Sequence, residues 1–445
     1  MESPRLRDLA ACFEGVIPSI IATVDADGMP NISYLSHVHF VDDDHVALSN
    51  QYFAKTAANV RSRGTATVLV VDGRSGAQFL LDLAFVRSFA EGDLFDRMSD
   101  HLDAMSAQQG MSGMMALRGA DLYRVRHCEA VPALNPPEAE PVHEGPDAAG
   151  RLSAAARLAL AIGAQGDADT AIDLALDGIA EGMGFRHLMV LIPDPGGRRL
   201  SVLTSRGYET LGIGSEVTMG DGVIGIAAAR RRPLRLSDLS RGRRYAAAVK
   251  EGTAIPGAGV PYPGLDAPLS QIAIPMISRG QLVGVLFAEA PLRFAFTRED
   301  EDALVLIAGQ LAACIALDEL AAPDAPAPAP PPAEAGAGPR IRVRYFPFDD
   351  SIFIDDDYLI RGVAGRLLHH FLRAHLATGQ RDFTNREIRL APDLRLPDVK
   401  DNLETRLILL RRRLDERNAP IRLQRPERGR LRLDLTGRPE IEVVT

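Results

Sequence analysis

The sequence predicts a multidomain protein in which a β-rich barrel module, an α+β module and a second, smaller α+β module follow one another. Residues 321–339 read AAPDAPAPAPPPAEAGAGP and set the last module apart from the first two. This stretch cannot form a helix, because proline lacks an N–H and clashes with the preceding turn, so we expect a solvated spacer. Short strand patterns with tight turns fill residues 1–135, and helices flanking strands fill residues 150–320. A chain of 445 residues holds roughly three domains of ordinary size.

Composition narrows the class of protein. The chain is 46% hydrophobic, which is ample for packed cores. Its three cysteines, Cys12, Cys128 and Cys314, lie far apart, which argues against a disulfide framework or a zinc ribbon. No apolar run approaches the ~18 residues of a membrane helix, and the first residues lack the apolar core of a secretory signal. We therefore expect a cytoplasmic protein with reduced thiols.

Charge is distributed unevenly along the chain. Residues 340–445 hold 22 Lys and Arg against 17 Asp and Glu, a net charge of +5. Because the whole chain carries −9, residues 1–339 carry −14. A basic end on an acidic body favours an anionic partner for the last module, although an Arg-rich composition without such a partner is an equal alternative.

The first module has the strand and turn pattern of a small barrel. A strand at Ile17–Val24 runs into the turn sequence DADG at residues 25–28. Helices are expected at Ala54–Arg61 and 92–109. The remaining strands are expected at Asn31–Phe40, His45–Ser49, Ala66–Val71, Ala77–Arg87 and Asp121–Val125.

This order resembles the FMN-binding split barrel of the pyridoxamine 5'-phosphate oxidase superfamily. The resemblance covers about 130 residues and is carried by DADGMPNIS, by HVALSNQYFAKTAANVRSRGTATVLVV and by DLYRV. It implies that FMN is the cofactor and that a strand-to-helix corner holds its phosphate, because a helix N-terminus with a Lys and hydroxyls binds phosphate well. The implied phosphate ligands are Ser49, Asn50, Lys55 and Thr56. The alternative is that Lys55 is an ordinary solvated residue.

The corner carries fewer cations than the family pattern. Ala54 stands where the oxidases have a further basic residue, and residues 33–38 contain no Lys or Arg. We therefore expect weak FMN binding and not the vitamin-forming reaction, since each charged hydrogen bond contributes roughly 1.5–3 kcal/mol.

Two histidines alternate on the strand that follows the first turn. His37 and His39 share one face, near His45 and three aspartates. A metal site is conceivable. We favour a barrel-interior or flavin-facing position for them, and predict no metal.

The second module resembles a GAF domain over about 170 residues. The motifs are GDGVIG at 220–225, IAIPMISRGQLVGVLFAE at 272–289 and FTREDEDAL at 296–304. Thr297 and Asp300 predict the capped start of a closing helix at Thr297–Leu320. No Lys-Ser/Thr follows GDGVIG, which excludes a P-loop. The resemblance implies a small-molecule sensor that dimerises through terminal helices, here Leu152–Ala164 and Thr297–Leu320, but the fold does not identify the ligand.

The third module resembles the winged-helix output domain of two-component response regulators. Strands are expected at Ile341–Phe346 and Ser351–Ile354, helices at Ile360–Leu376, Thr384–Leu390 and Pro397–Asn418, and a hairpin at Ile421–Gln424 and Arg430–Leu435. The family-like run is LRRRL at 410–414. The resemblance implies DNA contacts in the major groove and on phosphates. The implied DNA-binding residues are Lys400, Asn402, Arg406 and Arg413 on the long helix and Arg425, Arg428 and Arg430 on the wing.

Two other interpretations of the third module stay open. The arginines could form a solvated face paired with Glu404, Asp415 and Glu416. Ile408 and Leu409 stand where polar groove-facing side chains are usual, which favours a helix face that packs on a partner protein or a second protomer.

Together these features predict a cytoplasmic, homodimeric sensor and transcriptional regulator. A flavin barrel (1–135) and a GAF domain (150–320) would bias a DNA-binding winged helix (340–445) across the linker at 321–339. The alternatives are a flavin-dependent oxidoreductase with regulatory domains and a signalling scaffold whose winged helix binds protein. No receiver domain and no Ser/His/Asp constellation is evident in the sequence.

Overall fold

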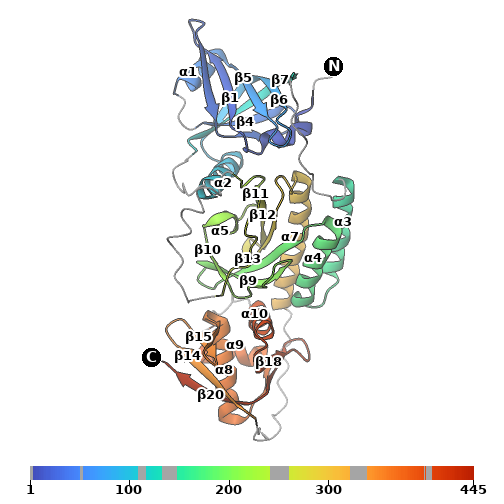
Figure 1. The fold of residues 1–445 in the computed structure, drawn as a ribbon, viewed down its shortest axis with the longest axis vertical. Helices are drawn as coiled ribbons and strands as arrows, with labels where there is room; N and C mark the ends of the chain where they lie inside the picture. Colours follow the sequence, from blue (N-terminus) through green and yellow to red (C-terminus); the bar gives the residue numbers. More distant parts are fainter. Residues whose placement is uncertain are drawn as a thin grey trace.

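The computed structural model describes residues 4–50, 54–108, 117–132, 148–240, 260–320, 338–394, 396 and 403–444. Figure 1 shows three parts stacked along the longest axis: an N-terminal domain in blue, a middle domain in green to gold, and a C-terminal region in orange and red. The spacer lies outside the described residues except for its last two. None of the described helices is long and apolar enough to cross a membrane.

The N-terminal domain is a curved seven-stranded sheet in the order β2-β1-β5-β6-β7-β4-β3. Its core is apolar and includes Ile21, Leu48, Val68 and Leu81, each almost fully buried. The elements are η1 (Leu6–Phe13), β1 (Ser19–Val24), β2 (Pro30–Leu35), β3 (Val38–Phe40), β4 (His45–Asn50), α1 (Ala54–Arg63), β5 (Thr65–Val71), β6 (Gln78–Phe89), α2 (Asp93–Gln108) and β7 (Gly119–Val131).

The middle domain is a six-stranded antiparallel sheet in the order β10-β9-β8-β13-β12-β11. Helices α3, α4 and α7 cover one face, and α5 lies on the other (Figure 1). The elements are α3 (Ala148–Gly163), α4 (Ala168–Met183), β8 (His187–Pro193), β9 (Arg199–Arg206), β10 (Glu216–Thr218), α5 (Gly222–Arg230), β11 (Leu234–Leu236), β12 (Ser270–Ser278), β13 (Gln281–Ala290) and α7 (Arg298–Leu320).

The C-terminal region contains two small sheets around three α-helices. One sheet has the order β16-β15-β14-β20 and the other β17-β19-β18. The elements are β14 (Arg340–Phe346), β15 (Ser351–Ile354), β16 (Asp357–Ile360), α8 (Gly362–Thr378), β17 (Asp382–Thr384), α9 (Asn385–Leu390), η2 (Pro392–Leu394), α10 (Leu403–Glu416), β18 (Ile421–Gln424), β19 (Arg430–Leu435) and β20 (Arg438–Val443). The expected strand pair, helices and hairpin are present in order, while their assignment as a winged helix stays a prediction.

Three expectations about local structure need correction. The run Asn31–Phe40 is two strands, because β2 pairs with β1 whereas β3 pairs with β4, and the chain turns at His37 between them. Strand β20 was not expected, since its exposed positions outnumber its buried ones, and it pairs in parallel with β14. The helix expected at Pro397–Asn418 is described only from Leu403, and it ends at Glu416; residues 397–402 lie outside the described residues.

The cap expected at Thr297 is present in the middle domain, and a second cap, at Asp167, was not predicted. Thr297 Oγ1 accepts a hydrogen bond from the Asp300 backbone N–H at 3.2 Å, and Asp300 Oδ2 accepts one from the Thr297 N–H at 2.8 Å. This reciprocal pair satisfies two donors at the start of α7. Helix α4 is capped in a similar way by Asp167, whose Oδ1 accepts from the Thr170 N–H at 2.9 Å.

The glycines of GDGVIG have distinct roles. Gly220 and Gly222 have φ angles of +86° and +60°, which permit the turn that opens α5. Gly225 is helical, but a methyl group at its Cβ position would lie 2.2 Å from the carbonyl oxygen of Thr218. The motif therefore sets the turn and lets α5 approach β10 closely.

We expect Gly225→Ala to lower the free energy of unfolding by about 1–3 kcal/mol, because backbone must move to admit the methyl group. The matched control is Gly309→Ala in α7, where a Cβ meets nothing within 4 Å. It should stabilise by about 0.5–1 kcal/mol through reduced backbone entropy. Urea unfolding of the full chain measures both, and equal stabilities for the two variants would contradict the packing argument.

Candidate functional site

The predicted phosphate corner is a small cavity in the N-terminal domain. Ser49 and Asn50 at the end of β4 line it, as do Thr56 on the first turn of α1 and Asp121 and Tyr123 on β7. The rest of the lining is apolar and consists of Ile21, Leu35, Leu48, Ala57 and Val60. Three of the four predicted ligands therefore meet at one cavity. The fourth, Lys55, is exposed on the same first turn and is not among the lining residues.

Asp121 is a lining residue that the sequence analysis did not single out. Its carboxylate accepts hydrogen bonds from Ser88 Oγ at 2.6 Å and from Asn50 Nδ2 at 3.2 Å. Thr56 Oγ1 accepts from Asn31 Nδ2 at 3.0 Å. The only sequence signal for Asp121 was its place at the start of the DLYRV strand, where it stands opposite Leu48 across the β4–β7 ladder.

The corner partly suits a phosphate group. It offers the Ser49 and Thr56 hydroxyls and the Asn50 amide beside the start of α1, and such donors at a helix N-terminus suit an anion. The Asp121 carboxylate opposes an anion, and its two hydrogen bonds reduce this repulsion only in part. The residues present therefore fit FMN with weakened phosphate binding, in line with the scarcity of cations.

A second polar cluster lies in the sheet of the middle domain. Glu289 on β13 is 3% exposed and follows Val285 and Phe287 at alternate positions, on the face that packs toward α5. Its carboxylate accepts hydrogen bonds from the Leu265 N–H at 2.7 Å and from Gln271 Nε2 at 3.1 Å. Burial raises the pKa of Glu289 above its ordinary range. A buried carboxylate among donors is a group that a small polar ligand can contact.

The two predicted DNA-contacting residues of the long helix that the structure describes do not face solvent. Arg406 and Arg413 are 6% and 5% exposed. The Arg406 guanidinium donates to the backbone oxygen of Pro193 in the middle domain. Arg413 Nε donates to the Leu359 oxygen at 2.8 Å, within the C-terminal region. The other two, Lys400 and Asn402, lie outside the described residues.

Helix α10 is docked on the middle domain through arginine–carboxylate pairs. Arg411 and Arg412 both bind Asp169 in the first turn of α4, with 2.8 Å between Arg412 Nε and Asp169 Oδ1. Arg412 Nη1 lies 3.0 Å from Asp173 Oδ1, one turn further along α4. Arg361, ahead of α8, pairs with Glu216 on β10. Arginine suits these contacts because its planar fork binds carboxylates through two parallel hydrogen bonds.

The end of α7 caps the start of α10. Glu319 Oε1 accepts a hydrogen bond from the Glu404 N–H at 2.6 Å, and Glu319 Oε2 lies 2.9 Å from Arg389 Nη2. A carboxylate at a helix N-terminus satisfies free N–H groups and interacts well with the helix dipole. Burial, and then the neighbouring Glu404 charge, raise the pKa of Glu319 to about 7, although Arg389 opposes the shift.

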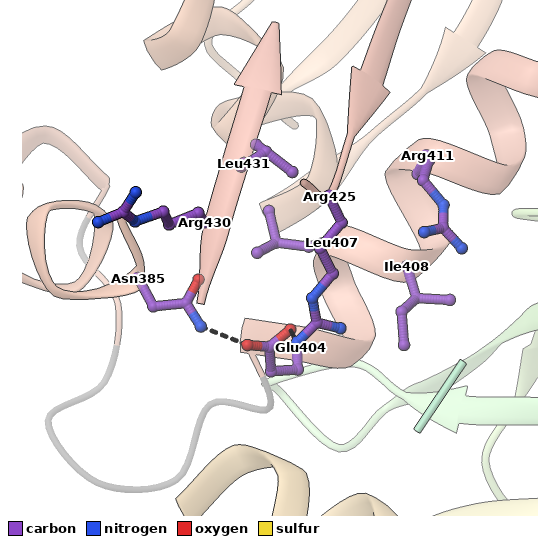
Figure 2. Close-up of a pocket in the computed structure, with 8 residues that line it drawn as sticks. All are labelled: Asn385, Glu404, Leu407, Ile408, Arg411, Arg425, Arg430 and Leu431. Carbon is purple, nitrogen blue, oxygen red and sulfur yellow. Dashed lines mark hydrogen bonds and ion pairs between the residues drawn. The ribbon is translucent and has the colours of Figure 1, made fainter. Parts of the chain in front are cut away.

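The hairpin arginines divide between this interface and solvent. Arg425 and Arg428 approach the buried Asp318 of α7 at 3.8 Å and 2.8 Å. Figure 2 shows Arg425 beside Glu404, which also accepts a hydrogen bond from Asn385, in a pocket between α9, α10 and the hairpin. Arg430, in contrast, pairs at 3.6 Å with Glu427 of its own hairpin.

The apolar pair of α10 is covered by the same chain. Ile408 and Leu409 are each 3% exposed and belong to a hydrophobic cluster that runs without a break from α4 and α7 into α8 and α10. Both residues therefore pack within this chain, in a cluster that the middle domain and the C-terminal region share. Among the described residues, no group of three or more His, Cys, Asp or Glu side chains is arranged to hold a metal ion.

Comparison with known proteins identifies two of the three parts. Residues 7–126 match the family model of pyridoxamine 5'-phosphate oxidase, and residues 165–316 match that of the GAF domain. The chain thus carries a pyridoxamine 5'-phosphate oxidase-like region followed by a GAF domain. No curated protein matches the chain.

Solved structures that are similar to it cover single parts. The GAF domain of an Acinetobacter phosphoenolpyruvate-protein phosphotransferase is 19% identical, covers 39% of this chain and 98% of its own, and has a TM-score of 0.32. An FMN-binding protein from Syntrophomonas wolfei is 20% identical over 29% of this chain and 90% of its own, with a TM-score of 0.25. Free methionine-R-sulfoxide reductase from Neisseria meningitidis is 17% identical, covers 40% of this chain and 95% of its own, and has a TM-score of 0.31.

The raised pKa of Glu319 predicts how pH affects the interface. The folded chain holds the Glu319 proton to a higher pH than the unfolded chain does, so stability is lost as pH rises from about 4.5 toward 7. Glu319→Gln should match wild type at pH 5 and be more stable at pH 8, by up to about 3 kcal/mol. Thermal unfolding at several pH values measures this difference. Glu299→Gln, an exposed residue of the same helix, is the control, and an equal pH trend in both variants would refute the assignment.

Proposed function

We propose that this protein is a sensory regulator in which the flavin-type N-terminal domain and the GAF domain control a DNA-binding C-terminal region. The observation that carries the proposal is the docking of α10 on the GAF domain. Arg425 and Arg428, which a winged helix would present to DNA, approach Asp318 there, and the neighbouring Arg411 and Arg412 of α10 pair with Asp169 and Asp173. The free thiols of the three buried cysteines support a cytoplasmic location.

The GAF carboxylates bind these arginines in the way that phosphates would. Arg411, Arg412, Arg425 and Arg428 each contact at least one GAF carboxylate, and the same side-chain type recognises phosphate through charged hydrogen bonds. Docking and duplex binding are therefore mutually exclusive for this face. The docked chain is the silent state, and DNA binding requires α10 to leave the GAF domain.

A signal can act on this equilibrium through the GAF domain. A ligand that contacts buried Glu289 and differs in affinity between the docked and released states shifts their populations. The scaffold alternative drew on the apolar pair Ile408 and Leu409, and both are buried in a cluster that the GAF domain and the C-terminal region share, so the docked chain offers neither to a second protein.

Weakening the interface should raise DNA affinity. Asp169→Asn removes the charge that holds Arg411 and Arg412, so a larger fraction of the chain is released. We expect about tenfold tighter binding of a mixed-sequence duplex by the full chain, measured by fluorescence anisotropy at one fixed salt concentration.

The control is Asp177→Asn, on the same helix, since Asp177 pairs with Arg206 inside the GAF domain and not with the C-terminal region. Its DNA affinity should equal that of wild type. Equal DNA affinities for Asp169→Asn and Asp177→Asn would contradict the proposal that docking covers a DNA-binding face.

We further propose that the barrel corner binds FMN weakly. Lys55→Ala removes the cation next to the cavity and should lower FMN affinity at least about tenfold. Asp121→Asn removes the opposing carboxylate while keeping an amide for Ser88 and Asn50, and should raise affinity about tenfold. Calorimetry with FMN measures both, and the same sign for the two variants would exclude this phosphate position.

The GAF domain is proposed to hold two chains together. Helices α3 and α7 pack against each other. Four leucines on these two helices are at least half exposed: Leu152, Leu160, Leu306 and Leu317. Leu160→Glu with Leu317→Glu should convert a dimer into a monomer in sedimentation, because it places charges in an apolar contact. Leu390→Glu is the control, at a residue that is 72% exposed on α9. A monomeric wild type at micromolar concentration contradicts this proposal.

A further inference from the structure

Two imidazoles and a thioether meet where the N-terminal sheet contacts α2. His37 lies in the turn between β2 and β3, while His101 and Met105 lie one turn apart on α2 and so share a face. The rings of His37 and His101 are stacked with their centroids 4.6 Å apart, and that of His39 lies 5.7 Å from His37. The group adjoins the barrel corner, because the His37 backbone N–H donates to Ser49 Oγ at 3.2 Å.

The ring nitrogens of this group lack hydrogen-bond partners. His37 is 3% exposed, and neither its Nδ1 nor its Nε2 has a partner among the described residues. The same is true of His101 Nε2. Buried polar atoms are nearly always satisfied, because an unpaired buried group costs free energy, so three orphaned nitrogens in one place point to a missing ligand.

Three donor atoms surround one point beside Gly15. A methyl group at the Cβ position of Gly15 would lie 2.9 Å from His37 Nδ1, 3.3 Å from His101 Nε2 and 3.3 Å from Met105 Sδ. Gly15 has a φ of +69°, which glycine adopts readily and other residues rarely do. Because Gly15 has no side chain, the three donor atoms pack closely against its Cα and lie near one another.

The His101 ring is held from the side away from this group. Its hydrogen bond to the backbone of Glu14 uses the other ring nitrogen and leaves Nε2 with a lone pair. This is the outer contact that usually orients a metal-binding histidine.

Two imidazole nitrogens and one thioether sulfur favour a soft, singly charged metal ion over a hard divalent one. A thioether with imidazoles suits Cu(I), whereas hard divalent ions need carboxylate or water oxygens. The nearby Glu14 carboxylate is already bound by Arg235 Nη1 and Ser237 Oγ, each at 2.7 Å. The charge of Arg298 reaches both His37 and His39 and penalises a divalent ion more than a monovalent one.

We propose that His37, His101 and Met105 form a Cu(I) site beside Gly15. Coordination requires the two stacked rings to turn so that His37 Nδ1 and His101 Nε2 face one ion at ~2.0–2.1 Å. Helix α2 contacts the GAF domain through Asp100, which lies 3.1 Å from Arg230, and Asp96, which lies 2.9 Å from Arg232. A bound ion therefore joins the N-terminal sheet to a helix that is anchored on the GAF domain. The proposal does not depend on flavin or DNA binding, although the His37 backbone contacts Ser49 of the barrel corner.

The test measures Cu(I) transfer from the coloured complex of copper with bicinchoninate, under argon with ascorbate, to the full-length protein. Wild type should withdraw one equivalent. Met105→Leu keeps the packing and removes the sulfur, and should weaken Cu(I) binding at least tenfold; His101→Gln should weaken it at least a hundredfold. X-ray absorption of the copper-loaded wild type should show nitrogen and sulfur neighbours, with the sulfur lost in Met105→Leu.

Three controls fix the assignment. Met98→Leu, a buried methionine two turns earlier on α2, should bind like wild type. His45→Gln, at a half-buried histidine outside the group, should do the same. So should Cys12→Ser, which removes a buried thiol on η1. The proposal is overturned if wild type takes no copper, if Met105→Leu and His101→Gln bind like wild type, or if affinity falls with Cys12→Ser instead.

Discussion

The arrangement of the chain depends on the pairing of Asp169 with two arginines of α10. Arg411 and Arg412 both point at one carboxylate, and burial lowers the pKa of each guanidinium below its ordinary value. The pair is only partly buried, so its loss costs less than the about 3–5 kcal/mol of a fully buried pair. Both arginines depend on this carboxylate in the docked arrangement. The capping of α10 by Glu319 reinforces the same arrangement.

The GAF domain makes similar contacts at its other end. Arg235 on β11 is buried between Glu14 of the N-terminal domain and Glu301 of α7, at 2.7 Å and 3.0 Å. Since α7 also carries Asp318 and Glu319 at its far end, one helix takes part in both boundaries. A rigid helix that is held by charge at both ends can connect a change at one boundary to the other. The middle domain is thus placed to transmit a signal from the N-terminal domain to the C-terminal region.

Much of the fold followed from patterns that are local in the sequence. Tight turns, alternating strands and the Thr297–Asp300 cap are each defined by residues two to four positions apart. Each is found in the structure. The corner residues Ser49, Asn50 and Thr56 meet as expected, because they flank one strand-to-helix connection. The matches to the oxidase-like and GAF family models agree with the first two resemblances.

What the sequence could not reveal are contacts between distant residues. Asp169 and Arg412 are separated by 243 positions, so no local pattern predicts their pairing, and the arginines of α10 were expected to be exposed. Asp121 lies in the phosphate corner because β7 pairs with β4. His101 contacts His37 because α2 packs on the sheet. The sequence had assigned Arg406 and Arg413 to DNA and had given Asp169, Asp121 and His101 no role, whereas tertiary packing placed each of them beside a distant residue of the chain.

The most direct measurement is hydrogen exchange of the α10 backbone amides in a double-mutant cycle of Asp169→Asn and Arg412→Met. The account predicts that each single change speeds exchange across Leu403–Glu416, and that the double change adds little to either, because both remove the same interaction. Exchange rates in α10 that match wild type in all three variants would contradict it, since α10 would then be held in place without this pair.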